Sequence, residues 1–274
     1  MPLDYYLRNP ALTEWEKFHE LDKTFFSETV KKKSFEDVLK RPRASYIVAV
    51  DKSNNSFLGY YQIAAYGKEG IIHRIGVHPQ VQRKGLGTKL LESAINSLKE
   101  AGCTKIKLYV RTDNEAAINL YKKFDFEIEK KSYQFIVKYS DLIDEPQGKC
   151  REAQWHEIPM FCLIFNQNPD QIKLYFGQEN QLVLVYEYRG EQLGFCRFSP
   201  QFPGAMPFLI KNTDFMMDFI SLLKQYISDP QFDSFKLTID NQKELVQLLI
   251  DKGISINYEL YVMTKSVPLT EEEK

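Results

Sequence analysis

The stretch that decides the fold reads Val77-His78-Pro79-Gln80-Val81-Gln82-Arg83-Lys84-Gly85-Leu86-Gly87-Thr88. An apolar run over 71–77 predicts a strand that enters this stretch, and a helical pattern begins directly after its glycines. Such a loop turns backbone N–H groups toward an anion, because the first turn of a helix has unpaired donors and carries the positive end of the helix dipole. Gly85 and Gly87 leave the backbone open to a diphosphate, and Arg83 and Lys84 add positive charge beside it.

A second motif follows a predicted helix over 86–101 and a predicted strand over 105–111, and it reads Asn114-x-x-Ala117-x-x-Leu120-Tyr121-x-Lys123-x-x-Phe126. Together with Gln82-x-x-Gly85-x-Gly87, this motif resembles the acetyl-CoA signature of the GNAT superfamily of N-acetyltransferases. The family normally has glycine just before the last phenylalanine, where this chain has Asp125. The alternative for the loop is a plain strand-to-helix turn that binds no ligand.

The resemblance implies an α/β (α+β) fold with a mixed, largely antiparallel sheet flanked by helices. It also implies acetyl-CoA as co-substrate and no metal. The strand that ends at Val77 should splay from the strand over 105–110, so that the pantetheine arm pairs with its free edge. A backbone N–H near 75–77 would then polarise the thioester carbonyl. The cofactor-binding residues expected are Ile75, Gly76, Val77, Gln82, Arg83, Lys84, Gly85, Leu86, Gly87, Thr88 and Asn114.

Transfer to an amine requires a group that removes a proton. An alkyl ammonium has a pKa of ~10.4, so its neutral form at pH 7 costs about 4.6 kcal/mol. His73 is the first candidate for the base, because it shares the strand parity of Ile75 and Val77. Glu69 shares that parity and is the second candidate. The competing interpretations are a hydrogen-bonded strand histidine and a solvated loop carboxylate.

The resemblance assigns the proton donor of the leaving thiolate to Tyr121. A phenol of pKa ~10 can protonate a thiolate whose thiol has a pKa of ~8.5 when the two are close. Tyr121 lies seven residues after Asn114, two turns along one helix face, so both side chains would reach the same cofactor arm. The alternatives are that Tyr121 is a buried helix aromatic and that Asn114 only caps the helix.

The second half of the chain repeats the element order of the first. A shift of 127 residues places Asp240-Asn241 on Asp113-Asn114 and 235–237 on 108–110. We therefore expect a tandem arrangement, with a catalytic GNAT-like domain over 1–140, a linker over 141–152 and a degenerate copy over 153–274. The copy has no Gly-x-Gly before its long helix, and Leu248 stands at the position of Tyr121.

Composition restricts the class of partner. The 274 residues are 43% hydrophobic and 27% charged, and the net charge of −1 gives no field that favours nucleic acid or an anionic membrane. No apolar run reaches ~18 residues, and no signal peptide is visible. The cysteines lack the spacing of a zinc site or of a disulfide framework, which favours a reducing cytoplasm. These residues are Cys103, Cys150, Cys162 and Cys196.

We therefore expect a cytoplasmic N-acetyltransferase that moves an acetyl group from acetyl-CoA to a small-molecule or peptide amine by direct, sequential transfer. The sequence shows neither a Gly-x-Ser-x-Gly elbow nor a Cys/His pairing. We therefore expect no covalent enzyme intermediate. We expect a monomer or homodimer, with neither nucleic acid nor membrane as partner. The alternatives are a non-catalytic acyl-CoA-binding module and an acyltransferase with a longer acyl or aminoacyl-tRNA donor, the last disfavoured by the near-neutral charge.

Overall fold

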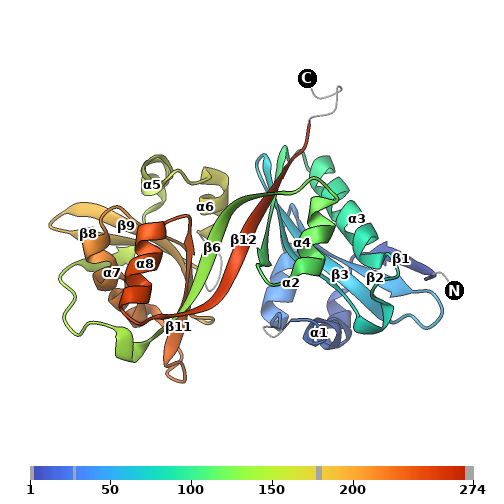
Figure 1. The fold of residues 1–274 in the computed structure, drawn as a ribbon, viewed down its shortest axis with the longest axis horizontal. Coiled ribbons are helices and arrows are strands. Elements are labelled where there is room, and N and C mark those ends of the chain that lie inside the picture. The colour runs from blue at the N-terminus through green and yellow to red at the C-terminus, as the bar shows by residue number, and fades with distance from the viewer. Residues whose placement is uncertain (1–2, 27–28, 177–180, 269–274) are drawn as a thin grey trace. The chain divides into compact units, whose positions relative to one another are not determined.

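The computed structural model describes residues 3–26, 29–176 and 181–268 (Figure 1). Its contacts divide the chain into two compact units. Unit 1 comprises Met1–Tyr109, Glu115–Glu127 and Met263–Lys274, and unit 2 comprises Val110–Asn114 and Ile128–Val262. Each unit consists of a mixed, largely antiparallel sheet with helices against it, which confirms the predicted fold class.

The sheet of unit 1 begins with four antiparallel neighbours, after which the fifth strand runs parallel to the fourth. In sheet order these strands are β1 (Tyr5–Arg8), β2 (Ala44–Asp51), β3 (Phe57–Tyr66), β4 (Glu69–Val77) and β5 (Lys105–Arg111). The parallel pair requires a crossover, which α3 supplies. The helices of this unit are α1 (Trp15–Lys23), α2 (Lys32–Lys40), α3 (Leu86–Glu100) and α4 (Glu115–Lys122).

Two apolar layers cover the sheet of unit 1. The predicted stripe on α3 is confirmed, because the side chains of Leu86, Leu90, Leu91, Ala94, Ile95 and Leu98 are all buried. The three- and four-residue spacing of these positions places them on one helix face. An aromatic cluster from α1, α2, β2 and β3 forms the other layer, and its largest members are Phe18, Phe35, Tyr46 and Tyr60.

Unit 2 has the sheet order β12-β6-β11-β10-β9-β8-β7. These strands are β6 (Glu127–Lys138), β7 (Lys149–Glu152), β8 (Leu182–Tyr188), β9 (Glu191–Ser199), β10 (Gly204–Ile210), β11 (Ser234–Asp240) and β12 (Ser255–Ser266). The helices are α5 (Ile158–Phe165), α6 (Pro169–Tyr175), α7 (Met216–Leu222) and α8 (Lys243–Asp251). From β7 to β12 the order of helices and strands matches that from β1 to β6, which confirms the tandem arrangement. Among the described residues, no helix combines the length and apolarity needed to cross a membrane.

The compact units divide the chain differently from the continuous domains drawn from the sequence, which stay a prediction. Part of the expected linker is structured, since 149–152 form β7 and pair with β8. The N–H groups of Gln147 and Gly148 also donate to the Asp218 carboxylate, at 2.6 and 2.7 Å. Strand β6 pairs with β11 over Ser132–Lys138, so it contributes to the sheet of unit 2.

The end of β12 completes unit 1. Met263 is fully buried, and the Val267 N–H donates to the Thr104 carbonyl at 2.8 Å. The Lys265 ammonium lies 3.1 Å from the Asp125 carboxylate. Strand β12 therefore begins in unit 2 and ends beside β5 in unit 1. Sequence periodicity predicts a strand at this position but not the sheet that the strand joins.

We predict that Met263→Ala lowers the free energy of unfolding of unit 1 by about 2–4 kcal/mol, because the truncation leaves a cavity beside β5. Ser266→Ala, at an exposed position of the same strand, should change it by less than about 0.5 kcal/mol. Trp15 lies in unit 1 and the half-exposed Trp155 in unit 2, so urea unfolding followed by Trp15 fluorescence in a Trp155→Phe background reports unit 1. Equal effects of the two alanines would contradict this placement of β12.

Candidate active site

The glycine loop adopts the conformation of an anion-binding nest. Strand β4 ends at Val77, a short 3-10 turn spans Pro79–Val81, and α3 starts at Leu86. Between them, Arg83 and Gly85 have positive φ values of 60° and 84°. Left-handed residues alternating with right-handed ones turn successive N–H groups toward one concave side. A Cβ on Gly85 would meet nothing within 4 Å, so the backbone conformation, rather than lack of space, favours glycine there.

The first turn of α3 leaves its backbone donors available. Gly85 is the N-cap and supplies no side-chain cap, and the Lys89 N–H donates to its carbonyl at 3.2 Å. The amides of 86–88 precede that bond and have no partner inside the helix. Leu86 is buried and anchors the turn, whereas Arg83, Lys84 and Thr88 are exposed. The loop therefore exposes backbone donors and two cations at the positive end of a helix.

The loop is tied to the strand before it. The side-chain amide of Gln82 donates to the Val77 carbonyl at 3.1 Å. A Cβ on Gly87 would lie 3.7 Å from both Val77 and Leu120, at ordinary contact distance. Strand β4, the loop and α4 therefore meet at Gly87. The role that this geometry gives Gln82 is to hold the loop, and its binding of a ligand stays a prediction.

Strands β4 and β5 separate where the loop needs space. Their pairing runs from Glu69↔Lys105 to Ile72↔Leu108, while β4 continues to Val77. The His78 N–H donates to the Leu58 carbonyl beside β3, at 2.8 Å. Because successive amides of a strand point to opposite sides, the N–H groups of Ile75 and Val77 point away from β3, toward the open side. The expected splay is present, and it leaves these two donors at a free strand edge.

A β-bulge at His73 invalidates the parity argument for the base. Gln62 pairs with Arg74 but Ile63 pairs with Ile72, so the register shifts by one residue at His73. A Cβ on Gly70 would meet Leu98 of α3 at 2.9 Å, whereas one on Gly76 would meet Phe25 at 2.2 Å. In a regular strand Gly70 and Gly76, six residues apart, would face the same side of the sheet, but here they face opposite sides. The expectation that Glu69, His73, Ile75 and Val77 share one face is therefore wrong.

The two candidate bases lie at different distances from the loop. His73 is exposed, its Nε2 lies 3.4 Å from the Tyr66 hydroxyl, and it stands four residues, about 13 Å of strand, before Val77. Glu69 stands eight residues, about 26 Å, before Val77, and its carboxylate pairs with the Lys107 ammonium at 2.6 Å. Of the two residues, His73 lies closer to the strand end.

Tyr121 is buried on α4, with 6% of its surface exposed, and its ring lies 6.0 Å from that of Phe126. Burial raises the pKa of the Tyr121 phenol, which therefore keeps its proton at neutral pH. The departure from the family at Asp125 is accommodated, because Asp125 takes a φ of 59° and the Phe126 N–H donates to the Tyr121 carbonyl at 3.1 Å. Aspartate tolerates this left-handed conformation better than most residues.

The sequence analysis did not identify a buried charged cluster beside β4. The fully buried Asp22 accepts hydrogen bonds from the Tyr60 hydroxyl, from Arg74 at 3.0 Å and from the Val30 N–H at 2.6 Å. The Arg74 guanidinium also lies over the Phe26 ring, 4.5 Å from its centroid. The available signal was an arginine inside an apolar strand and an aspartate beside the apolar stripe of α1.

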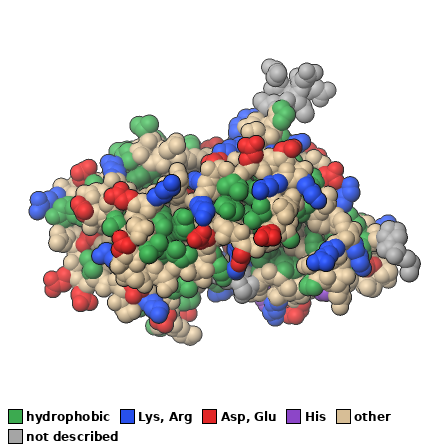
Figure 2. All heavy atoms as spheres, viewed as in Figure 1, with side chains coloured by type: hydrophobic (Ala, Val, Ile, Leu, Met, Phe, Trp, Pro, Cys, Tyr) green, Lys and Arg blue, Asp and Glu red, His purple; other side chains and the backbone are tan. Residues whose placement is uncertain are grey.

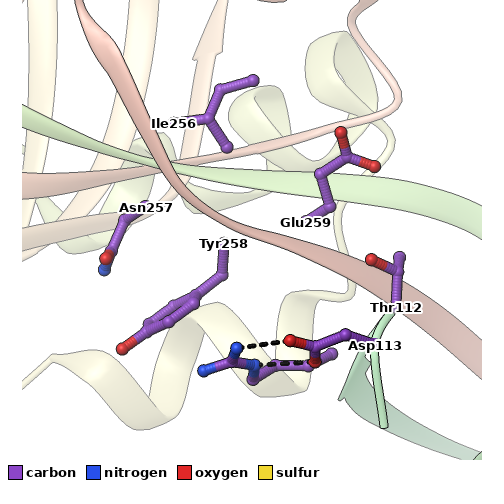
Figure 3. Close-up of a pocket in the computed structure, with 7 residues that line it drawn as sticks. Thr112, Asp113, Ile256, Asn257, Tyr258 and Glu259 are labelled. Atoms are coloured by element: carbon purple, nitrogen blue, oxygen red, sulfur yellow. Dashed lines mark hydrogen bonds and ion pairs between the residues drawn. The ribbon is translucent and has the colours of Figure 1, made fainter. Parts of the chain in front are cut away.

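Unit 2 contains a separate cavity of about 240 Å³, shown in Figure 3. The Arg111 guanidinium pairs with the Asp113 carboxylate at 2.5 and 2.9 Å and lies over the Tyr258 ring. Glu259 pairs with Lys131 at 3.1 Å. Because these charges neutralise one another, the cavity indicates no ligand class. Its lining residues are Arg111, Thr112, Asp113, Ile256, Asn257, Tyr258 and Glu259.

Asn114 follows this cavity directly in the chain. Its side chain is exposed, its N–H donates to the Arg111 carbonyl at 3.0 Å, and it immediately precedes α4. It belongs to unit 2, whereas Tyr121 belongs to unit 1. A role for Asn114 in cofactor binding stays a prediction. Among the described residues, no group of three or more His, Cys, Asp or Glu side chains is arranged to hold a metal.

Comparison with known proteins gives consistent results. The model of the acetyltransferase (GNAT) family matches residues 15–126. A Bacillus subtilis (strain 168) protein designated a ribosomal protein bS18-alanine N-acetyltransferase is 31% identical over 119 residues, which cover 43% of this chain and 78% of that protein. The mycothiol acetyltransferase of Saccharopolyspora erythraea is 34% identical over 84 residues, 30% of this chain and only 27% of that protein.

The fold of the whole chain also has a solved counterpart. A tandem GNAT protein from the clavulanic acid biosynthesis pathway superposes with a TM-score of 0.65 at 10% sequence identity. The superposition covers 98% of this chain and 100% of that protein. At this identity the likeness concerns the fold alone.

We predict that Gly85→Ala lowers the free energy of unfolding by about 1–2 kcal/mol, because alanine is strained at a φ of 84°. Gly87→Ala is the matched control. Its added Cβ has ordinary contacts and its φ is not positive, so the change should stay within about 0.5 kcal/mol. Urea unfolding measures both variants. A Gly85→Ala protein as stable as the parent would show that the loop conformation differs from the one described.

Proposed function

The chain belongs to the acetyltransferase (GNAT) family, and we propose that it transfers an acetyl group from acetyl-CoA directly to a primary amine. The observation that carries this proposal is the position of the exposed nest over 83–88, next to the free edge of β4. A phosphate group and an extended arm attached to it require this combination of anion site and unpaired strand edge.

In this proposal the backbone amides of 83–88 hold the diphosphate, with Arg83 and Lys84 contributing charge. The N–H groups of Ile75 and Val77 are the donors available to the thioester carbonyl, because they point to the side where β5 has separated. Glycine is required at position 76 between them, because an added Cβ would clash with the Phe25 ring on the sheet face. A preorganised donor of this kind typically contributes 10²–10³ in rate.

The reaction that we propose is balanced without a covalent enzyme intermediate. The neutral amine nitrogen bonds to the carbonyl carbon, the carbon–sulfur bond breaks, and the thiolate leaves. The ammonium proton is removed beforehand by His73 or by water, which passes it to solvent. Tyr121 protonates the leaving sulfur, and the second proton that the nitrogen loses as the amide forms returns to Tyr121 through water. Glu69 is the weaker candidate, because it lies farther from the loop and is paired with Lys107. A buried phenol that keeps its proton suits the role of donor.

We propose one acetyl-CoA site per chain, in unit 1. The corresponding turn of unit 2 precedes α7, where the Asn212 side chain accepts a hydrogen bond from the Asp214 N–H at 2.9 Å. A backbone N–H at the start of α7 is therefore already hydrogen-bonded within its own turn, whereas the glycine loop before α3 has no such side-chain cap. Leu248 of α8 supplies no proton at the position equivalent to Tyr121. We assign to unit 2 a structural role, or one in binding the acceptor.

For the acceptor we propose a small-molecule or peptide amine. The name of the Bacillus subtilis relative specifies an alanine of a ribosomal protein, which is compatible with a peptide acceptor. Acidic and basic side chains are intermixed on the face shown in Figure 2, so this face has no single basic patch for a polyanion. All four cysteines are free thiols, so we propose a reducing, cytoplasmic compartment. We also propose that the protein acts as a monomer or homodimer.

We predict that Gly87→Glu weakens CoA binding at least 100-fold by calorimetry while the Tm stays within about 3 °C. An added Cβ makes only ordinary contacts at this position, but the glutamate carboxylate repels a phosphate. Gly87→Gln is the matched control for size, and it should weaken binding less than the glutamate does. CoA binding of parental affinity in the glutamate variant would refute the assignment of the loop.

We predict that Tyr121→Phe lowers kcat by about 10²-fold or more, because the leaving thiolate loses its proton donor, and leaves the Kd for CoA within about twofold. Tyr61→Phe is the control, since this buried tyrosine points its hydroxyl at Ser93 of α3, 3.0 Å away. Steady-state kinetics and calorimetry measure the two effects. If kcat is unchanged, Tyr121 has no part in the mechanism. If CoA binds and no amine in a broad panel is acetylated, the chain is a binding module.

A further inference from the structure

The proposed reaction makes no use of the charged cluster formed by Asp22, Tyr60 and Arg74. Arg74 and Gly76 lie two residues apart beyond the bulge, so both side-chain directions point to the face covered by α1. The cluster therefore lies directly beside the strand end whose amides we assign to the thioester. Buried charges in a wall of apolar residues are costly, and charged groups in such surroundings are candidates for a functional role.

A chain of contacts leads from the guanidinium to the strand end. Arg74 lies over the Phe26 ring, Phe26 meets Phe25 edge to face at 5.1 Å, and Phe25 lies against the α-carbon of Gly76. Tyr60, which hydrogen-bonds the same carboxylate as Arg74, is the register partner of Gly76. The guanidinium thus leans toward the carboxyl end of β4.

The cation is the outward-facing member of the pair. The Asp22 side chain is fully buried, and its two oxygens accept from Tyr60, Arg74 and the Val30 N–H. The Arg74 side chain remains 22% exposed. A molecule that approaches this face therefore meets the positive end of the ion pair before its negative end.

We propose that Arg74, held in place by Asp22, lowers the pKa of the acceptor ammonium and so raises the fraction of neutral amine. This inference rests on the proposed acetyltransferase function. A nearby cation disfavours the charged form of an amine, and desolvation among aromatic rings adds to the effect. A lowering of the amine pKa by about one unit corresponds to about tenfold more neutral amine at pH 7. Asp22 acts as a positioning residue.

Several titratable or charged groups surround Arg74, and histidine is the one residue type among them that ordinarily changes charge between pH 5 and 8. They are Asp22 on α1, Tyr60 on β3 and Tyr46 on β2, with Arg41 after α2 and the exposed His73 beside Arg74 on β4. Burial raises the pKa of both tyrosines above the ordinary value, so neither phenol ionises. Burial lowers the pKa of Arg74, but Tyr60 and Asp22 more than compensate, so the guanidinium stays charged.

The test is the pH profile of kcat/KM for whichever amine is acetylated fastest in a panel of alkylamines, amino sugars and short peptides. The double variant Asp22→Asn/Arg74→Gln removes the pair without leaving a buried unpaired carboxylate. In the profile of this variant we expect the rise of kcat/KM with pH to occur about one pH unit higher than in the parent. At pH 7 its kcat/KM should be about tenfold lower. At pH values above both rises, the two proteins should have the same kcat/KM. Arg74→Lys, which keeps the charge, should retain the parental rise.

The matched control is Arg8→Gln/Glu14→Gln, which removes another arginine–carboxylate pair of unit 1, joined at 2.6 and 2.7 Å on β1. In its profile the rise should not move. A loss of kcat/KM that is equal at every pH in the Asp22/Arg74 variant would overturn the inference and leave the proposed function intact. A loss of kcat/KM only for acceptors that carry a carboxylate would also overturn the inference, because it would show that Arg74 binds that carboxylate. If the parent acetylates no amine, the proposed function itself fails.

Discussion

The separation of β4 from β5 after Ile72 is the constraint on which the rest of the candidate site depends. The bulge at His73 occurs just where the two strands part, and bulges bend the strand that carries them. Because of that divergence, two amides of β4 have no strand partner, and α3 can begin beside the open edge with its own amides free. Backbone donors of the strand edge and of the first turn of α3 are therefore available at the same end of β4.

The sequence predicted those parts of the structure that depend on local patterns. The strand–glycine loop–helix order of 71–101, the buried stripe of α3 and the repeated element order in the second half all follow from glycine spacing or apolar periodicity. The bulge was not predictable in this way, because one extra residue in a strand changes no residue type and only reverses the direction in which the later side chains point. The same is true of the Asp22–Arg74 pair, which joins residues 52 positions apart.

Unit 2 shows that the strand separation and the chemistry are independent features. Its β10 and β11 pair only at Gly204↔Lys236 and Ala205↔Leu237, so this parallel pair also parts early. The turn before α7, however, is capped by its own Asn212 and contains no glycine pair. An early separation of parallel strands therefore occurs in unit 2 without a glycine loop, so the loop distinguishes the two units better than the strand separation does.

The course of β12 has a consequence for synthesis. A ribosome makes Met263 136 residues after Glu127, the last residue of the preceding segment of unit 1. At 5–20 residues per second this corresponds to about 7–30 s. Throughout that interval the β5 edge lacks its final neighbour, and an unpaired edge is open to association with other chains. The nascent N-terminal half therefore passes through a period in which protection by chaperones is most valuable, and its sheet closes only after Met263 has been made.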